Sequence, residues 1–233
     1  MVLDYKEMIC SNRMSLVVSL PANDLDLAKA ALRGGAQALK VHLNVWHRAS
    51  GNTFGSFEQQ KGFLQELIAL AQDVPVGLVP GADEAFITED EMRQLEEMGI
   101  KFFSCYSDNL PAFLVYSKKI RHMVAIHNNY DDHILNGVRH SPLVDVLECS
   151  IMPGDVYGSP LVYSDVLRYT DVVEKTGKPV LIPTQKKIRP DEVRALHDAG
   201  CKAVMIGAIV MGDKTPAECE RATAAFREAV EAV

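Results

Sequence analysis

The sequence predicts an α/β fold, a single (β/α)8 TIM barrel, and three observations lead to this prediction. Eight short apolar stretches alternate with eight amphipathic stretches along the 233 residues. Many of the short stretches are apolar on both faces, which is typical of parallel strands that helices cover. The phrases GGAQALKV, MGIKFFS and AGCKAVMI each place a glycine shortly before a strand, as the loops of helix–strand units do. Eight such units in a chain of this length favour a closed barrel over an open sheet.

The predicted elements follow one another from residue 15 onwards. SLVVSL is a short apolar strand, and the amphipathic helix after it ends at Gly34 and Gly35. TEDEMRQLEEMG is a helix with a threonine cap, an acidic first turn and a glycine at its end. We expect strands at 15–20, 38–45, 75–81, 101–107, 121–127, 144–152, 179–185 and 203–210. We expect helices at 23–35, 57–72, 88–99, 110–118, 131–139, 164–177, 189–200 and 215–233.

Composition indicates one globular domain over residues 1–233, in which 1–14 form an N-terminal extension with a short helix at the barrel bottom. The formal charge is −7 and there is no basic stripe, which argues against nucleic acid or an anionic membrane as a partner. Five scattered cysteines without a CxxC pair, and the lack of an apolar leader, predict reduced thiols and a cytoplasmic location. The sequence leaves a homo-oligomer open.

The strand at 38–45 carries the polar face that is most informative about function. Lys40, His42 and Asn44 alternate with apolar residues that a helix layer would cover, so the three polar side chains are expected to point into the barrel. Glu148, in another apolar strand, is the natural counter-charge for Lys40. One interpretation is a structural ion pair. The other is a catalytic acid–base pair, with His42 beside it, or an amine that polarises a substrate carbonyl. Three polar residues in one strand favour catalysis.

Further polar residues fall where strands end and loops begin, which is where (β/α)8 barrels carry their sites. The strand at 101–107 offers Ser104 or Tyr106. We expect the loops 46–56 and 153–164 to be substrate lids, because they are long for such connections. His42, His47, His127 and Glu148 lack a local ligand spacing such as HExxH, so no metal is expected, and no cofactor is predicted. The candidate substrate-binding residues are Asn44, His47, Arg48, His127, Asn128 and Ser150.

The stretch PVLIPTQKKIRPDEVRALHDAGCKAVMIGAIV resembles the ribulose-phosphate-binding barrel superfamily, which includes N-acetylmannosamine-6-phosphate epimerase and indole-glycerol-phosphate synthase. The resemblance implies that the loops after the last two strands hold a phosphate. The turn TQKK has neither the glycines nor the acidic residue of the resembled barrels, and PVGLVPG lacks the epimerase lysine. The epimerases' catalytic pair is therefore not carried over. The phosphate-binding candidates are Thr184, Gln185, Lys186, Lys187, Gly207 and Ala208.

These observations predict an enzyme that acts on a small phosphorylated sugar or sugar acid. Isomerisation or epimerisation by proton transfer next to a carbonyl fits the Lys40 and Glu148 pair best. An aldolase that cleaves a carbon–carbon bond is the first alternative, although LECSI lacks the lysine that Schiff-base aldolases of this fold usually carry there. A barrel that binds a small ligand without catalysis is the second alternative.

Overall fold

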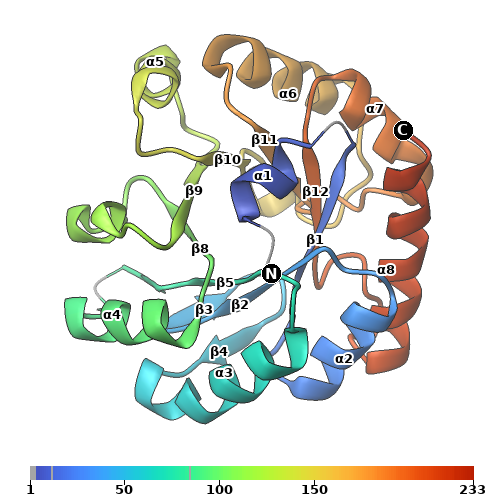
Figure 1. Cartoon of the computed structure of the whole chain (residues 1–233). Helices are drawn as coiled ribbons and strands as arrows, with labels where there is room; N and C mark the ends of the chain where they lie inside the picture. The colour runs from blue at the N-terminus through green and yellow to red at the C-terminus, as the bar shows by residue number, and fades with distance from the viewer. Residues whose placement is uncertain (1–3, 12, 84) are drawn as a thin grey trace.

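The computed structural model describes residues 4–11, 13–83 and 85–233 and confirms the predicted fold. Eight parallel strands close into a barrel in which each strand pairs with the next barrel strand along the chain, and the last pairs with the first. Helices surround this barrel (Figure 1). The barrel strands are β1 (Ser15–Ser19), β2 (Ala38–His42), β5 (Val76–Val79), β8 (Phe102–Tyr106), β9 (Arg121–Ile126), β10 (Val146–Cys149), β11 (Val180–Pro183) and β12 (Ala203–Ile206).

Seven of the eight segments that were predicted to be helical contain α-helices. These are α2 (Leu25–Arg33), α3 (Phe57–Ala71), α4 (Glu89–Met98), α5 (Asp132–His140), α6 (Tyr163–Thr176), α7 (Val193–Asp198) and α8 (Pro216–Glu231). The helix expected at 110–118 is instead a short 3-10 helix, η1 (Ala112–Tyr116). Pro111 fixes its start, and Leu114 is its only buried side chain, so little packing favours a longer helix. Two more short 3-10 helices, η2 (Gly154–Val156) and η3 (Pro190–Glu192), lie in loops.

Two small hairpins extend the barrel at the carboxyl ends of its strands. After β2 the chain forms β3 (Val45–His47) and β4 (Asn52–Phe54), which occupy much of the predicted lid at 46–56. After β5 it forms β6 (Gly81–Ala82) and β7 (Ala85–Phe86). The barrel strands predicted at 38–45 and 75–81 are shorter in the structure, because the chain turns into a hairpin after each of them.

The opposite end of the barrel is closed by α1 (Tyr5–Ile9), which lies in front of the strands in Figure 1. Residues 1–3 and 12 of the predicted extension lie outside the described residues. The buried Tyr5 ring stacks on Phe102 with a centroid separation of 3.8 Å. Gly77 makes room for this stack, since a Cβ there would lie 2.4 Å from the Phe102 ring. Since α1 fills this end of the barrel, the cavity described below opens at the carboxyl ends of the strands.

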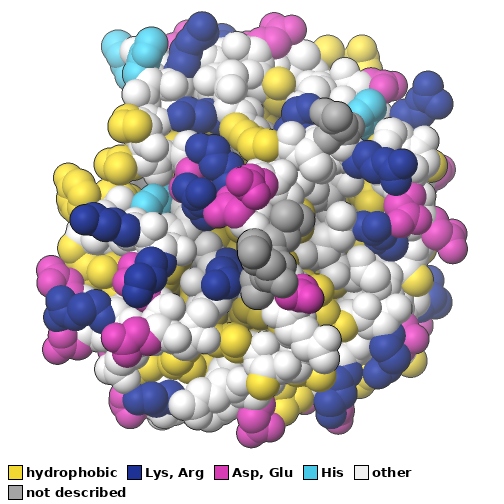
Figure 2. All heavy atoms as spheres, in the orientation of Figure 1, with side chains coloured by type: hydrophobic (Ala, Val, Ile, Leu, Met, Phe, Trp, Pro, Cys, Tyr) yellow, Lys and Arg dark blue, Asp and Glu magenta, His cyan; other side chains and the backbone are white. Residues whose placement is uncertain are grey.

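The surface around α1 carries charges of both signs, which Figure 2 shows interspersed over this face. Lys6 pairs with Asp145 at 3.0 Å, and Arg121 pairs with Asp4 at 2.9 Å. These pairs tie α1 to the barrel strands. Among the described residues, no helix combines the length and the apolar character needed to cross a bilayer.

Candidate active site

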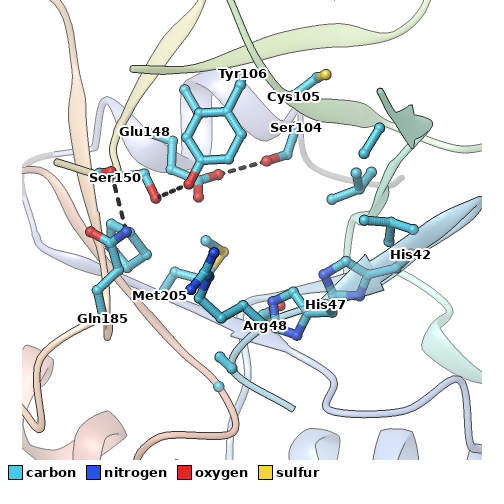
Figure 3. A pocket seen from close by; sticks show the side chains of 18 of the residues that line it. His42, His47, Arg48, Ser104, Cys105, Tyr106, Glu148, Ser150, Gln185 and Met205 are labelled. Atoms are coloured by element: carbon cyan, nitrogen blue, oxygen red, sulfur yellow. Dashed lines mark hydrogen bonds between the residues drawn. The ribbon is translucent and has the colours of Figure 1, made fainter. Parts of the chain in front are cut away.

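A cavity of about 430 Å³ opens at the carboxyl ends of the barrel strands, the end at which enzymes of this fold carry their sites. This volume falls within the range typical of small-molecule sites. Figure 3 shows polar side chains from opposite sides of the barrel converging on it. The predicted site residues that line the cavity are Lys40, His42, His47, Arg48, His127, Asn128, Glu148, Ser150, Thr184, Gln185, Gly207 and Ala208.

Lys40 and Glu148 face each other across the barrel interior, as the pattern of β2 predicted. The Lys40 Nζ lies 3.6 Å from Glu148 Oε2, and both side chains are less than 10% exposed. Ser104 also lines the cavity, and its hydroxyl donates a hydrogen bond of 2.6 Å to the same carboxylate oxygen. Lys40 and Ser104 therefore hold Glu148 in one orientation.

The second carboxylate oxygen of Glu148 differs from the first in its contacts. Both the lysine and the serine contact Oε2, while Oε1 accepts no hydrogen bond from the described residues. Oε1 is also absent from the group of fully buried atoms that lack a partner, so it is accessible from the cavity. Figure 3 shows one oxygen joined to Ser104 and the other directed into the open space. A ligand in the cavity can therefore reach a pre-oriented carboxylate oxygen.

His42 and His47 form an aromatic wall on the β2 side of the cavity. The two imidazole rings lie 4.5 Å apart, and Phe54 lies 4.6 Å from His42. Burial holds the pKa of His42 well below its usual range, and the positive charge of Lys40 contributes in the same direction. Burial lowers the pKa of His47 to about 4. Both rings are therefore neutral at pH 7, and each can donate one hydrogen bond and accept another.

Neither ring nitrogen of His42 has a hydrogen-bond partner within the described residues, although both atoms are buried. Buried polar atoms without a partner cost free energy, so they are uncommon and call for an explanation. His42 borders the cavity, but its two ring nitrogens are not exposed to it in this structure. His47 differs, because its Nδ1 lies 3.0 Å from the Ser50 hydroxyl.

The lowered pKa values predict that the protein loses stability in mild acid. Unfolding restores ordinary histidine pKa values near 6.5, so the unfolded chain binds more protons than the folded protein below that pH. The free energy of unfolding therefore does not vary with pH through these histidines above pH 6.5, and it decreases as the pH falls from 6.5 towards 4. We expect urea midpoints to fall between pH 6.5 and about 5, above the range of most carboxylates. In His47→Gln the decline should be smaller, and an equally steep decline would contradict the assignment.

The β8 strand contributes both Ser104 and Tyr106 to the cavity, rather than one or the other. Ser104 and Tyr106 are two positions apart, so both point into the barrel. They were predicted as alternative site residues, which overlooked this alternation. The Tyr106 ring stacks on His127 with centroids 3.7 Å apart, and its hydroxyl lies 2.9 Å from the Ser150 hydroxyl. Burial raises the pKa of Tyr106 well above its usual range, so this phenol keeps its proton.

One cysteine borders the cavity, but it is not poised as a nucleophile. Burial raises the pKa of the Cys105 thiol to about 12, with a further contribution from the Glu148 charge. Since the thiolate is the nucleophilic form, Cys105 is unreactive at neutral pH. Across the ranges 4–11, 13–83 and 85–233, no three His, Cys, Asp or Glu side chains gather in a way that could hold a metal ion.

The ends of β11 and β12 border the cavity, but their donors differ from those expected. The Gln185 amide is fully used: Nε2 donates to the Ser150 carbonyl and the Tyr157 hydroxyl, and Oε1 accepts from the Met152 N–H. Thr184 Oγ1 accepts a hydrogen bond of 3.2 Å from the Gly207 N–H. By contrast, the N–H groups of Ala208 and Ile209 have no acceptor in the described part of the chain.

The two predicted phosphate lysines do not reach the cavity, which corrects that expectation. Lys186 is buried, and its Nζ donates to Ser159 Oγ at 2.8 Å and lies 3.4 Å from Asp165 Oδ2. Lys187 is exposed, and neither lysine borders the cavity. A lysine already bound to a buried carboxylate cannot serve a ligand elsewhere. Sequence reasoning missed this pairing, because Asp165 lies in α6 whereas Lys186 follows β11.

Asn44 is the other predicted residue that the cavity does not include. β2 ends at His42, and Asn44 takes a left-handed backbone conformation with φ of 51°. Its N–H donates to the Gly55 carbonyl at the base of the β3–β4 hairpin. The alternation that places Lys40 and His42 inside the barrel is therefore broken before Asn44, which serves the turn instead.

Comparisons with solved structures place the chain among (β/α)8 barrels. Thiamine phosphate pyrophosphorylase from Pyrococcus furiosus matches with a TM-score of 0.66 and 16% identity, over 95% of this chain and 97% of that one. Phosphoribosyl anthranilate isomerase from Thermus thermophilus matches with a TM-score of 0.65 and 16% identity, over 92% and 99%. Tryptophan synthase from Mycobacterium tuberculosis matches with a TM-score of 0.70 and 13% identity, over 94% and 93%.

The chain therefore shares the (β/α)8 barrel fold of these solved structures, which is the fold that its sequence predicted. No protein-family model matches the sequence, and no curated protein sequence matches it. At 16% identity or less, the likeness to these three structures establishes the fold alone. The reaction must be argued from the residues of the cavity.

Proposed function

We propose that the protein is an enzyme that acts on a small phosphorylated sugar or sugar acid and moves a proton next to the substrate's carbonyl group. The observation that carries the proposal is the Glu148 carboxylate, which Lys40 and Ser104 fix through Oε2 while Oε1 faces the cavity. A general base needs an accessible oxygen in a defined orientation, and Glu148 has one.

In the proposed reaction, Glu148 Oε1 accepts the proton from the carbon beside the carbonyl group. The electron pair of the broken C–H bond moves onto the carbonyl oxygen, where the Lys40 ammonium stabilises the developing negative charge. Addition of a proton to the former carbonyl carbon, with transfer of the adjacent hydroxyl proton to the carbonyl oxygen, gives isomerisation. Addition of a proton to the original carbon from its opposite face gives epimerisation. The neutral His42 ring borders the same cavity, where we propose that it forms part of the substrate pocket beside Lys40.

The remaining cavity residues suit a substrate with several hydroxyl groups and one anionic end. His47, His127, Asn128 and Ser150 present polar atoms at the rim and wall, where we propose that they contact hydroxyls. The anionic end lies at the β11–β12 end, near Thr184, Gly207 and Ala208. Two of the similar structures have phosphate or phosphoribosyl in their names, which supports phosphorylated compounds as the class to test first.

A Schiff-base lyase is the second candidate, and the position of Lys40 favours it. Its amine is buried in the barrel interior, beside a carboxylate that can shuttle protons during imine formation. Borohydride reduction distinguishes the two reactions. A lyase would leave a reduced adduct on a peptide containing Lys40, whereas proton transfer alone would leave this peptide unmodified.

The proposal is tested by incubating the protein in D2O with a panel of phosphorylated ketoses, aldoses and sugar acids. We expect one compound to raise the melting temperature and to gain deuterium at the carbon next to its carbonyl group, as proton NMR would show. If a compound binds tightly but never exchanges, the non-catalytic barrel is the better description. If no phosphorylated compound binds or exchanges, the proposed substrate class is wrong.

A further inference from the structure

The loop that joins β3 to β4 is held beside the end of β12, and it carries Arg48. Asn52 Nδ2 donates a hydrogen bond of 2.8 Å to the Pro21 carbonyl just after β1. Lys214, in the loop after β12, donates one of 2.8 Å to the Ser50 carbonyl. These two bonds tie the hairpin to the segments that leave β1 and β12. Arg48, two residues before Ser50, therefore belongs to a loop that is held beside the end of β12.

The side chain of Arg48 extends across the mouth of the barrel to the loop after β10. A Cβ atom added to Gly154 would lie 2.8 Å from an Arg48 terminal nitrogen and 3.1 Å from its Cζ. Arg48 is an exposed residue of the cavity rim, and Figure 3 shows its side chain extending over the cavity. A glycine at position 154 is what lets the guanidinium lie this close to the opposite loop.

The Arg48 guanidinium has no partner among the residues that the structure describes. Over the described ranges, Arg48 makes no hydrogen bond or ion pair, whereas Lys40, the other basic side chain that lines the cavity, is paired with Glu148. Arg48 therefore brings an uncompensated positive charge, in a planar fork suited to phosphate oxygens. The acidic Asp83 also borders the cavity, but it makes no ion pair with Arg48.

We propose that Arg48 is the charged half of a phosphate clamp, whose other half is the unpaired N–H groups of Ala208 and Ile209. The guanidinium neutralises the phosphate from the hairpin side, and the β12 turn donates backbone hydrogen bonds from below. The sequence had placed this charge on Lys186 and Lys187, which do not reach the cavity. The clamp would bind the phosphate group of the substrate class proposed above. This inference rests on the proposed function.

The single tryptophan of the chain gives a direct way to test this clamp. Trp46 lies two residues before Arg48, borders the cavity and is 60% exposed, so its fluorescence reports on ligands that reach the hairpin. We would titrate the full-length protein with inorganic phosphate and compare it with sodium chloride of equal ionic strength. Saturable, phosphate-dependent fluorescence and a phosphate-dependent rise in melting temperature are the expected results.

Three variants separate the clamp from a general charge effect. Arg48→Met should weaken phosphate binding roughly 10- to 100-fold, because it removes charge-assisted hydrogen bonds. Gly154→Ala keeps the arginine but displaces its guanidinium, and should weaken binding by a smaller factor. Lys187→Met removes an exposed charge outside the cavity and should leave binding unchanged. Wild-type affinity in Arg48→Met, or an effect of phosphate no larger than that of sodium chloride, would overturn the proposal.

The clamp and the proposed reaction fail in distinguishable ways. Arg48-dependent phosphate binding without any deuterium exchange would leave the clamp standing and remove the proton-transfer function. Deuterium exchange that is unaffected in Arg48→Met would keep the function and refute the clamp.

Discussion

Replacement of Glu148 with glutamine is expected to lower the rate of deuterium exchange by roughly 10²- to 10⁴-fold, the usual contribution of a general base. Glutamine has nearly the same shape, and its amide oxygen can still accept the Ser104 hydrogen bond that Oε2 accepts now. What it cannot do is take up a proton. The rate is measured by proton NMR in D2O with the best substrate from the panel.

Phosphate binding is the control for this variant, because Glu148 is not part of the proposed phosphate clamp. Glu148→Gln should bind inorganic phosphate with the wild-type affinity, read from Trp46 fluorescence. The change also leaves the buried Lys40 without its counter-charge, so the rate must be measured at a temperature where circular dichroism shows a folded protein. If folded Glu148→Gln exchanges deuterium at the wild-type rate, the carboxylate is structural and the ion pair merely fills the barrel.

The positions of Lys40, His42 and Glu148 were predictable because strand alternation is a local property. Val41 and Leu43 are fully buried against the helix layer, which leaves the intervening residues no direction but inwards. The same reasoning failed one step later, at Asn44. A left-handed residue at the start of a hairpin changes the direction of the chain, and no feature of the polar pattern marks where this happens.

The charged half of the proposed clamp illustrates a second limit of sequence reasoning. Lys186 and Lys187 were credible phosphate ligands, because they follow the seventh barrel strand directly. Which lysine is free depends on a carboxylate contributed by α6, and this pairing is a tertiary contact that the sequence does not encode locally. Arg48 was predicted to contact substrate, but its unpaired state and its approach to Gly154 appear only when the loops are assembled.

The buried pair of Lys186 and Asp165 leads to the second large expected effect, on stability. Both side chains are less than 10% exposed, and Ser159 is the other hydrogen-bond partner of the lysine. Asp165→Asn retains an oxygen that can accept the Val162 N–H at the start of α6 but removes the negative charge. An uncompensated buried ammonium should lower the free energy of unfolding by about 3–5 kcal/mol. Urea denaturation would show this as a lower midpoint with an unchanged slope.

Two comparison variants make this prediction specific to the ion pair. Lys187→Met, which alters the exposed neighbour, should change the free energy of unfolding by no more than about 0.5 kcal/mol. The double variant Asp165→Leu with Lys186→Met should recover much of the loss, because apolar side chains of similar volume need no counter-charge. The folded double variant should also bind inorganic phosphate as the wild type does. Weakened phosphate binding in it, with Arg48 intact, would return Lys186 to the phosphate site and contradict its assignment as a structural group that fixes the loop after β10 to the loop after β11.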